Sequence, residues 1–215
     1  MKQKYVVIVG DVIKSGSAKD RKEYWNKLQG VVNKVNEKYK ESFYAPMMII
    51  KGDEITAVLH HGEQSYTILR FFQEEFYPYQ IRFASVKGAI DVGIKTKNAS
   101  IMDGEAFWKA DDYLESIKKE RKYFHFDFGN ELLDEMISSM TSLLAHLKSR
   151  WSEKERMIIV LYEKYGNQMD AAEKCGITQQ GVSDALKRSY WREIRENEEI
   201  IEKVLKSYVG EYNAS

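Results

Sequence analysis

The amino-acid sequence predicts an α+β fold in its first part and an all-α domain in its last third. Short apolar runs alternate with amphipathic helical patterns as far as Phe128. From Gly129 onward no strand pattern returns, and helical periodicity continues. A length of 215 residues is comfortable for two domains. We therefore expect an α+β domain at 1–129, a connecting helix at 130–150 and a helical domain at 151–215.

The elements of the first domain follow one another in a definite order. Apolar and β-rich runs predict strands, and apolar residues three and four apart predict helices. The expected strands are 5–9, 47–50, 55–59, 81–92 and 122–128, and the expected helices are 19–40, 63–76 and 103–119. Gly52 and Asp53 suit the tight turn of a hairpin. The order β-α-β-β-α-β, followed by a helix and a strand, is that of a ferredoxin-like or palm domain, an antiparallel sheet backed by helices.

Composition and charge restrict the classes of function. Lysine plus arginine and aspartate plus glutamate each number 33, so the net charge is zero and any nucleic-acid-binding surface must be local. No apolar stretch reaches the ~20 residues that span a bilayer, and the first apolar run ends at Gly10 without a signal-peptide cleavage pattern. A single cysteine excludes a disulfide within the chain. We expect a cytoplasmic protein with no membrane partner.

Residues 152–192 carry the pattern of a helix-turn-helix. Ser152 and Glu155 fit a capping box at the start of the helix that precedes the motif. The small alanines at 171–172 permit two helices to cross closely, and Gly176 permits the turn between them. These local signals predict two short helices held at an angle.

The second helix of the motif is expected to present its polar side to a partner. Val182 and Leu186 are four residues apart and face inward. Gln, Ser and Lys are residue types that read base edges or hold phosphates. The predicted DNA-contacting residues are Thr178, Gln179, Gln180, Ser183, Lys187, Arg188 and Arg192. Because residues 151–215 contain ten basic and twelve acidic side chains, binding requires a focused basic face or a homodimer.

Two acidic turns lie at strand ends in the first domain. Asp11 follows the first strand, and Asp53 and Glu54 lie at the tip of the hairpin. Since these strands are neighbours in a palm domain, the carboxylates are predicted to meet at one hard cation such as Mg²⁺. The residues predicted to contact the phosphate of a bound nucleotide are Lys14, Ser15 and Lys51. Gly-Asp is also common turn chemistry, so a structural role for the aspartates stays open.

These segments resemble the palm domain of nucleotide cyclases of the adenylate and diguanylate type. Such cyclases carry an Asp after the first strand and a Gly-Asp hairpin, and the stretches 81–90 and 103–114 resemble later motifs of the adenylate type. Where cyclases place the Asn and Arg that stabilise the transition state, this chain has Trp108 and Asp112. An Asp cannot stabilise negative charge that develops on a phosphate. The resemblance therefore implies a cyclase-like domain without cyclase activity.

Two further resemblances concern the C-terminal part and the whole chain. The sequences Ala-Ala-Glu-Lys-Cys-Gly-Ile-Thr at 171–178 and Gln-Gly-Val-Ser-Asp-Ala-Leu-Lys-Arg at 180–188 resemble the helix-turn-helix of sigma-factor region four. Taken whole, the chain resembles the SatD family of bacterial proteins, through the segments 10–15, 52–54 and 103–107 with the helix-turn-helix after them. The SatD resemblance implies little about activity.

The resulting hypothesis is a DNA-binding transcriptional regulator whose cyclase-like domain senses a ligand or dimerises. A first alternative is an Mg²⁺-dependent nucleotide-binding or nucleotidyl-transfer enzyme, although the sequence favours a protein that is not an enzyme. A second alternative is a protein-interaction module, which a neutral or acidic face on the second helix of the motif would favour. His60 and His61 are interpreted as solvated turn residues, because only Glu63 can be placed near them as a further metal ligand.

Overall fold

The computed structural model describes residues 3–13 and 20–211, and internal contacts divide the chain into two compact units. Unit 1 comprises residues 1–140 and 201–215, and unit 2 comprises residues 141–200. The helices α4 (Glu131–Ser149) and α8 (Trp191–Glu211) each contribute residues to both units. The residues of the last helix after Ile200 belong to unit 1. The division at residues 129 and 150 stays a prediction.

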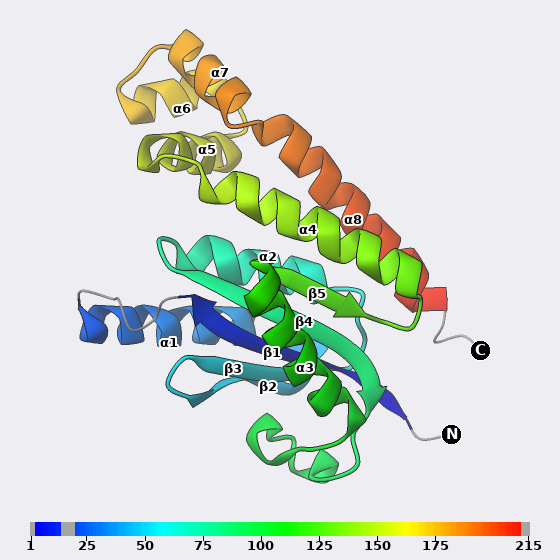
Figure 1. Cartoon of the computed structure of the whole chain (residues 1–215). Helices are drawn as coiled ribbons and strands as arrows, with labels where there is room; N and C mark the ends of the chain where they lie inside the picture. The colour runs from blue at the N-terminus through cyan, green and yellow to red at the C-terminus, as the bar shows by residue number, and fades with distance from the viewer. Residues whose placement is uncertain (1–2, 14–19, 212–215) are drawn as a thin grey trace. The chain divides into compact units, whose positions relative to one another are not determined.

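In the described part of the chain, unit 1 is built on a five-stranded sheet with the order β2-β3-β1-β4-β5 (Figure 1). The strands are β1 (Lys4–Ile13), β2 (Phe43–Lys51), β3 (Glu54–Leu59), β4 (Gln80–Ala89) and β5 (Phe124–Asp127). The central strand β1 pairs antiparallel with β3 and β4, which is the ferredoxin-like arrangement. The predicted α+β, palm-like fold is confirmed.

The prediction of an antiparallel sheet is wrong at its last strand. β5 pairs with β4 in parallel, with Phe83 opposite Phe124. The connection between them contains helix α3, and a crossover of this kind returns the chain to the same end of the sheet before the next strand begins.

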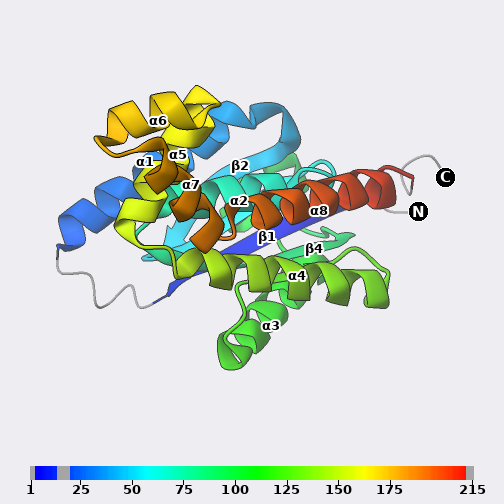
Figure 2. The same ribbon diagram turned by 90° about the horizontal axis from the view of Figure 1, so that it is seen from above.

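Helices cover both faces of the sheet (Figure 1, Figure 2). They are α1 (Arg21–Lys38), α2 (Ser65–Phe76) and α3 (Glu105–Glu120), and short 3₁₀ helices η2, η3 and η4 lie at Lys40–Ser42, Ile94–Thr96 and Ala99–Ile101. Val7 and Val9 of β1 belong to a core cluster with Ala110 and Leu114 of α3. Since side chains alternate along a strand, Gly10 faces the opposite layer, which contains α1 and α2. Within residues 3–13 and 20–211, no helix combines the length and the apolar character needed to cross a bilayer.

Unit 2 contains three short helices in sequence, α5 (Glu153–Tyr165), α6 (Gln168–Cys175) and α7 (Gln179–Arg188). The predicted capping box is present at the start of α5, where Ser152 and Glu155 exchange hydrogen bonds. Gly176 has a φ of 66° at the end of α6, a conformation that glycine adopts at low cost. Ala171 and Ala172 are buried, at 0% and 5% exposure, so the alanines lie in the core of unit 2.

Candidate functional site

Acidic side chains gather at one edge of the sheet in unit 1. Asp11, near the end of β1, lies opposite Glu54 of β3 on one side and opposite Arg82 of β4 on the other. Directly opposed residues point to the same face of an antiparallel pair, so these three side chains share the face that α3 covers. Lys118 of α3 reaches this edge, and its Nζ lies 3.4 Å from Asp11 Oδ1.

The carboxylates of Asp11 and Asp53 interact electrostatically. Burial raises the pKa of Asp11, Lys118 opposes the rise, and the negative charge of Asp53 adds to it. Burial, followed by the charges of Asp53 and Asp11, raises the pKa of Tyr24 to about 12. The Tyr24 hydroxyl is buried and has no hydrogen-bond partner among the described residues. The fold therefore brings the two predicted aspartates and a tyrosine hydroxyl into one electrostatic environment.

The third predicted carboxylate, Glu54, interacts with Asp111 of α3. Partial burial of its carboxyl group raises the pKa of Asp111, although part of the residue is exposed. The negative charges of Glu54, Asp112 and Asp103 raise this pKa further. Trp108, one turn earlier, is 60% exposed. The Asp111–Asp112 pair in the sequence is the signal by which Asp111 could have been found.

The predicted metal and phosphate contacts stay predictions. Among the described residues, no three Asp, Glu, His or Cys side chains converge closely enough to hold a metal ion by themselves. Lys14 and Ser15 lie outside the described residues, as does the side chain of Lys51 at the end of β2. The sequence does not single out Lys118 or Tyr24, because each lies on a helix and reaches this edge only through tertiary packing.

In unit 2, the helix α7 is amphipathic, with one apolar side and one polar side. Val182 and Leu186 are buried, at 0% and 8% exposure. Of the predicted DNA-contacting residues, Ser183 is half-buried and the exposed ones are Thr178, Gln179, Gln180, Lys187, Arg188 and Arg192. Thr178 also caps α7, since its Oγ1 accepts a hydrogen bond of 3.1 Å from the Gly181 amide. The fold thus leaves the predicted face of α7 accessible.

Charges of both signs lie around the end of α7. Arg188 pairs with Glu155 at 3.7 Å, and Arg192 pairs with Glu196 at 3.2 Å. Among the described residues, Lys187 makes no ion pair. This face of α7 therefore carries charges of both signs. Its basic side chains are exposed, and glutamates neutralise two of them.

A groove of about 580 Å³ lies beside α7 within unit 2. Ser183, Lys187 and Arg192 line it together with Trp191. The indole of Trp191 packs edge-on against Tyr162 at 4.9 Å between ring centroids. Its Nε1 donates a 2.7 Å hydrogen bond to Glu163. The groove therefore joins predicted DNA-contacting residues to a fixed aromatic ring.

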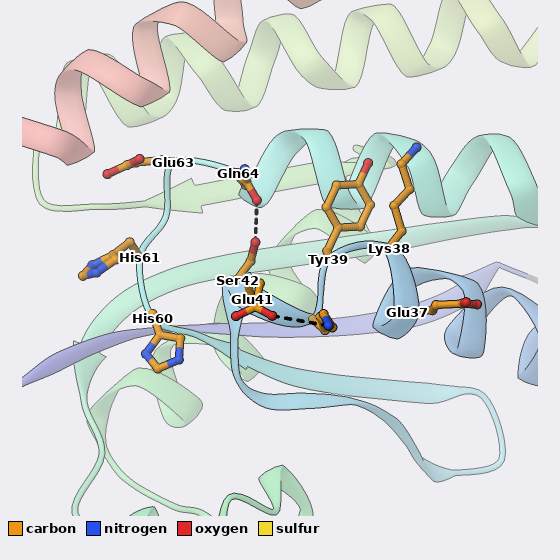
Figure 3. A pocket seen from close by; sticks show the side chains of 10 residues that line it. Glu37, Lys38, Tyr39, Glu41, Ser42, His60, His61, Glu63 and Gln64 are labelled. Atoms are coloured by element: carbon orange, nitrogen blue, oxygen red, sulfur yellow. Dashed lines mark hydrogen bonds and ion pairs between the residues drawn. The ribbon is translucent and has the colours of Figure 1, made fainter.

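A second cavity, of about 540 Å³, lies in unit 1 near the end of α1 and the start of α2. Figure 3 shows that His60, His61 and Glu63, which line it, do not point toward a common centre. Ser42 and Gln64 are hydrogen-bonded across the same cavity. Both histidines are exposed, as their interpretation as solvated turn residues requires.

By its architecture the chain is an α+β protein of two units, a palm-like unit and a helical unit in which a turn at Gly176 joins α6 to α7. The family model described as SatD family matches residues 5–203, and the chain belongs to this family. The predicted membership is thereby confirmed, whereas the resemblance of 171–188 to sigma-factor region four stays a prediction.

Two solved structures of bacterial light-regulated adenylyl cyclases match part of the chain. One is 10% identical with a TM-score of 0.43, and the alignment covers 57% of this chain and 74% of that chain. Another is 12% identical with a TM-score of 0.45, covering 59% of this chain and 43% of that chain. No curated protein matches the chain.

Proposed function

We propose that this SatD-family protein binds DNA through α7 and acts as a transcriptional regulator. The observation that carries the proposal is the geometry of α6 and α7. Buried alanines and a left-handed turn at Gly176 hold the two helices together, and α7 keeps its polar side exposed. A short helix that presents Gln, Ser, Lys and Arg from a compact support is suited to the major groove.

Electrostatics limits the strength of this binding. Residues 141–200 contain ten basic and ten acidic side chains, so affinity depends on where the basic ones lie. Lys187, Arg188 and Arg192 lie together at the end of α7 and just after it. Both arginines are exposed, and the pair of Arg192 with Glu196 lies entirely at the surface, where an ion pair contributes little to stability. DNA phosphates can therefore replace these glutamates. We expect moderate affinity that decreases steeply with salt.

Replacing Lys187 and Arg192 together with alanine is expected to weaken DNA binding ~10-fold or more at low salt. The slope of log K against log salt should also decrease in magnitude by ~2, because two phosphate contacts are lost. Fluorescence anisotropy on genomic fragments over a range of salt concentrations measures both quantities. The matched control replaces Lys203 and Lys206, two exposed lysines of α8, and should leave binding unchanged.

A different outcome would favour the protein-interaction alternative. If the full-length chain binds no fragment even at low salt, the proposed DNA contact is wrong. Equal weakening by both double variants would mean that net charge, and not the face of α7, controls the association.

A second function is proposed for the acidic edge of unit 1, the binding of Mg²⁺ with a nucleotide phosphate by Asp11, Asp53 and Glu54. The mutual repulsion of Asp11 and Asp53 supports it, because a divalent cation would neutralise both charges. Mg²⁺ is usually held by one or two carboxylates and completes its coordination with phosphate oxygens and water. Lys118 now faces Asp11, and its pairing with Glu115 at 2.7 Å gives it an alternative partner when a cation is bound.

Addition of Mg²⁺ and a nucleoside triphosphate is expected to raise the melting temperature of the chain. A ligand present at a hundred times its dissociation constant stabilises by ~2.7 kcal/mol. Asp11→Asn should abolish this response, and Glu37→Gln, an exposed position near the end of α1, should retain it. Differential scanning fluorimetry with a panel of triphosphates, each with and without Mg²⁺, makes the comparison.

The same response should depend on pH. Mg²⁺ requires the ionised carboxylate, and the pKa of Asp11 lies above its ordinary value of 3.8. Stabilisation by Mg²⁺ should therefore be present near neutral pH and decline at a higher pH than for an ordinary aspartate. The absence of any shift in the unchanged chain, across the whole panel at neutral pH, would rule this function out.

A further inference from the structure

An exposed apolar stripe runs along helix α4. Leu132, Met136 and Leu143 are 70%, 54% and 57% exposed. At ~100° per residue their spacings of four and seven place the three side chains within ~40° of one another on one unbroken helix. Met140 and Leu147 lie beside this stripe and are half-buried. Single exposed leucines are ordinary, but a contiguous apolar stripe marks an interaction surface.

The opposite side of α4 is already occupied by its own chain. Ile137, Thr141 and Leu144 are buried, at 3%, 0% and 6% exposure. The helix therefore has one side committed to the fold and a second apolar side that faces outward. A polar outward side would be expected if α4 met only solvent.

The charges of α4 indicate which partner fits the stripe. The exposed charged residues near its beginning are Glu131 and Glu135, whereas Arg150 is exposed just after its end. A second copy of α4, placed antiparallel, brings the acidic beginning of each helix to the basic end of the other. The antiparallel helix dipoles also attract each other. A parallel copy would instead place glutamates opposite glutamates.

We propose that α4 is a dimerisation helix that pairs antiparallel with α4 of a second copy of this chain. The two-fold axis passes near Ser139, an exposed small residue at the middle of the helix that permits close approach. Such an interface is isologous, since one surface serves both partners. The inference does not depend on DNA or Mg²⁺ binding, and if α7 binds DNA, the dimer doubles the number of basic side chains available to phosphates.

Light scattering coupled to size-exclusion chromatography tests the dimer on the full-length chain without DNA. The unchanged protein should have about twice the 25.1 kDa mass of one chain. Leu143→Glu should raise the dissociation constant ~10-fold or more, because it would bury an unpaired carboxylate between two apolar stripes. Val160→Glu, at a position 62% exposed on α5, is the matched control and should stay dimeric. A single-chain mass for the unchanged protein at ~0.1 mM, or equal effects of the two variants, would overturn the proposal.

Cysteine cross-linking tests the orientation. In a Cys175→Ala background, Ser139→Cys should form a disulfide-linked dimer under mild oxidation. Arg150→Cys should not, because in an antiparallel pair the two copies of this residue are ~30 Å apart, well beyond disulfide reach. Cross-linking at both positions would require a parallel pair and contradict the proposed orientation. The absence of cross-linking at Ser139, in a protein that light scattering finds dimeric, would place the interface elsewhere.

Discussion

Replacement of Glu198 with alanine is expected to lower the free energy of unfolding of the helical unit by ~3–5 kcal/mol. The Glu198 side chain is only 2% exposed and accepts from Lys148 at 2.8 Å, and the Lys148 side chain is 11% exposed. Arg195 contributes a second ion pair to the same carboxylate. Removing the carboxylate takes a hydrogen-bonded counter-charge away from a buried ammonium, which costs far more than the loss of an exposed ion pair.

Urea denaturation of the full chain, followed by far-UV circular dichroism, measures this effect. The matched control is Glu196→Ala, whose side chain is 62% exposed and pairs with Arg192 one turn away. That change should alter the free energy of unfolding by less than ~0.5 kcal/mol. A double variant, Lys148→Met with Glu198→Leu, should recover most of the loss, because it leaves no buried charge unpaired at this pair. Equal losses in Glu198→Ala and Glu196→Ala would contradict the proposed role of burial.

The change Gly104→Ala is expected to destabilise unit 1 by ~3 kcal/mol. Gly104 precedes α3 with a φ of 150°, and an added Cβ would lie 2.8 Å from the Asp91 amide nitrogen and 2.9 Å from the Ala89 carbonyl oxygen. Both contacts are with backbone atoms, so they cannot be relieved by a side-chain rotation. Backbone strain and overpacking each cost ~1–3 kcal/mol.

Gly30 supplies the control for this prediction. It lies within α1, and an added Cβ would meet no atom within 4 Å beyond its chain neighbours and the backbone of its own helix. Gly30→Ala should therefore stabilise the chain by ~0.5–1 kcal/mol, since alanine is the better helix former. Thermal and urea unfolding of the two variants should shift in opposite directions. A loss below ~1 kcal/mol for Gly104→Ala would mean that the turn before α3 adapts to a side chain.

Local interactions made parts of this fold predictable. Two examples are the capping box of Ser152 and Glu155 and the turn at Gly176. Each depends on residues only three or four positions apart, so the local sequence is sufficient to predict it. The two-residue hairpin turn between β2 and β3 is local for the same reason. The start of β2 was harder to predict, because it pairs irregularly with β3 at Ala45 and Met48 and its side chains do not alternate simply.

The candidate site was predictable only in part. Asp11 lies next to a recognisable strand pattern, and Asp53 lies in a recognisable turn pattern. The strand order of a palm domain predicts that these two strands are neighbours, so the two aspartates are expected to be near each other. Their electrostatic partners Tyr24 and Lys118 lie on helices at the far side of long connections. No periodicity in the sequence indicates which turn of such a helix will face a given strand.

Sequence patterns were sufficient to predict the α+β class, the order of the elements, the caps at Ser152, Gly176 and Thr178 and membership in the SatD family. Four features follow only from the packing of the folded chain. They are the parallel direction of β5, the electrostatic partners of Asp11, the backbone contacts that require Gly104 and the burial of Lys148 beside Glu198. This difference follows from the range of the interactions along the chain. Caps, turns and amphipathic periods act within a few residues, whereas the pair Lys148–Glu198 joins side chains 50 positions apart that meet only after the helices have packed.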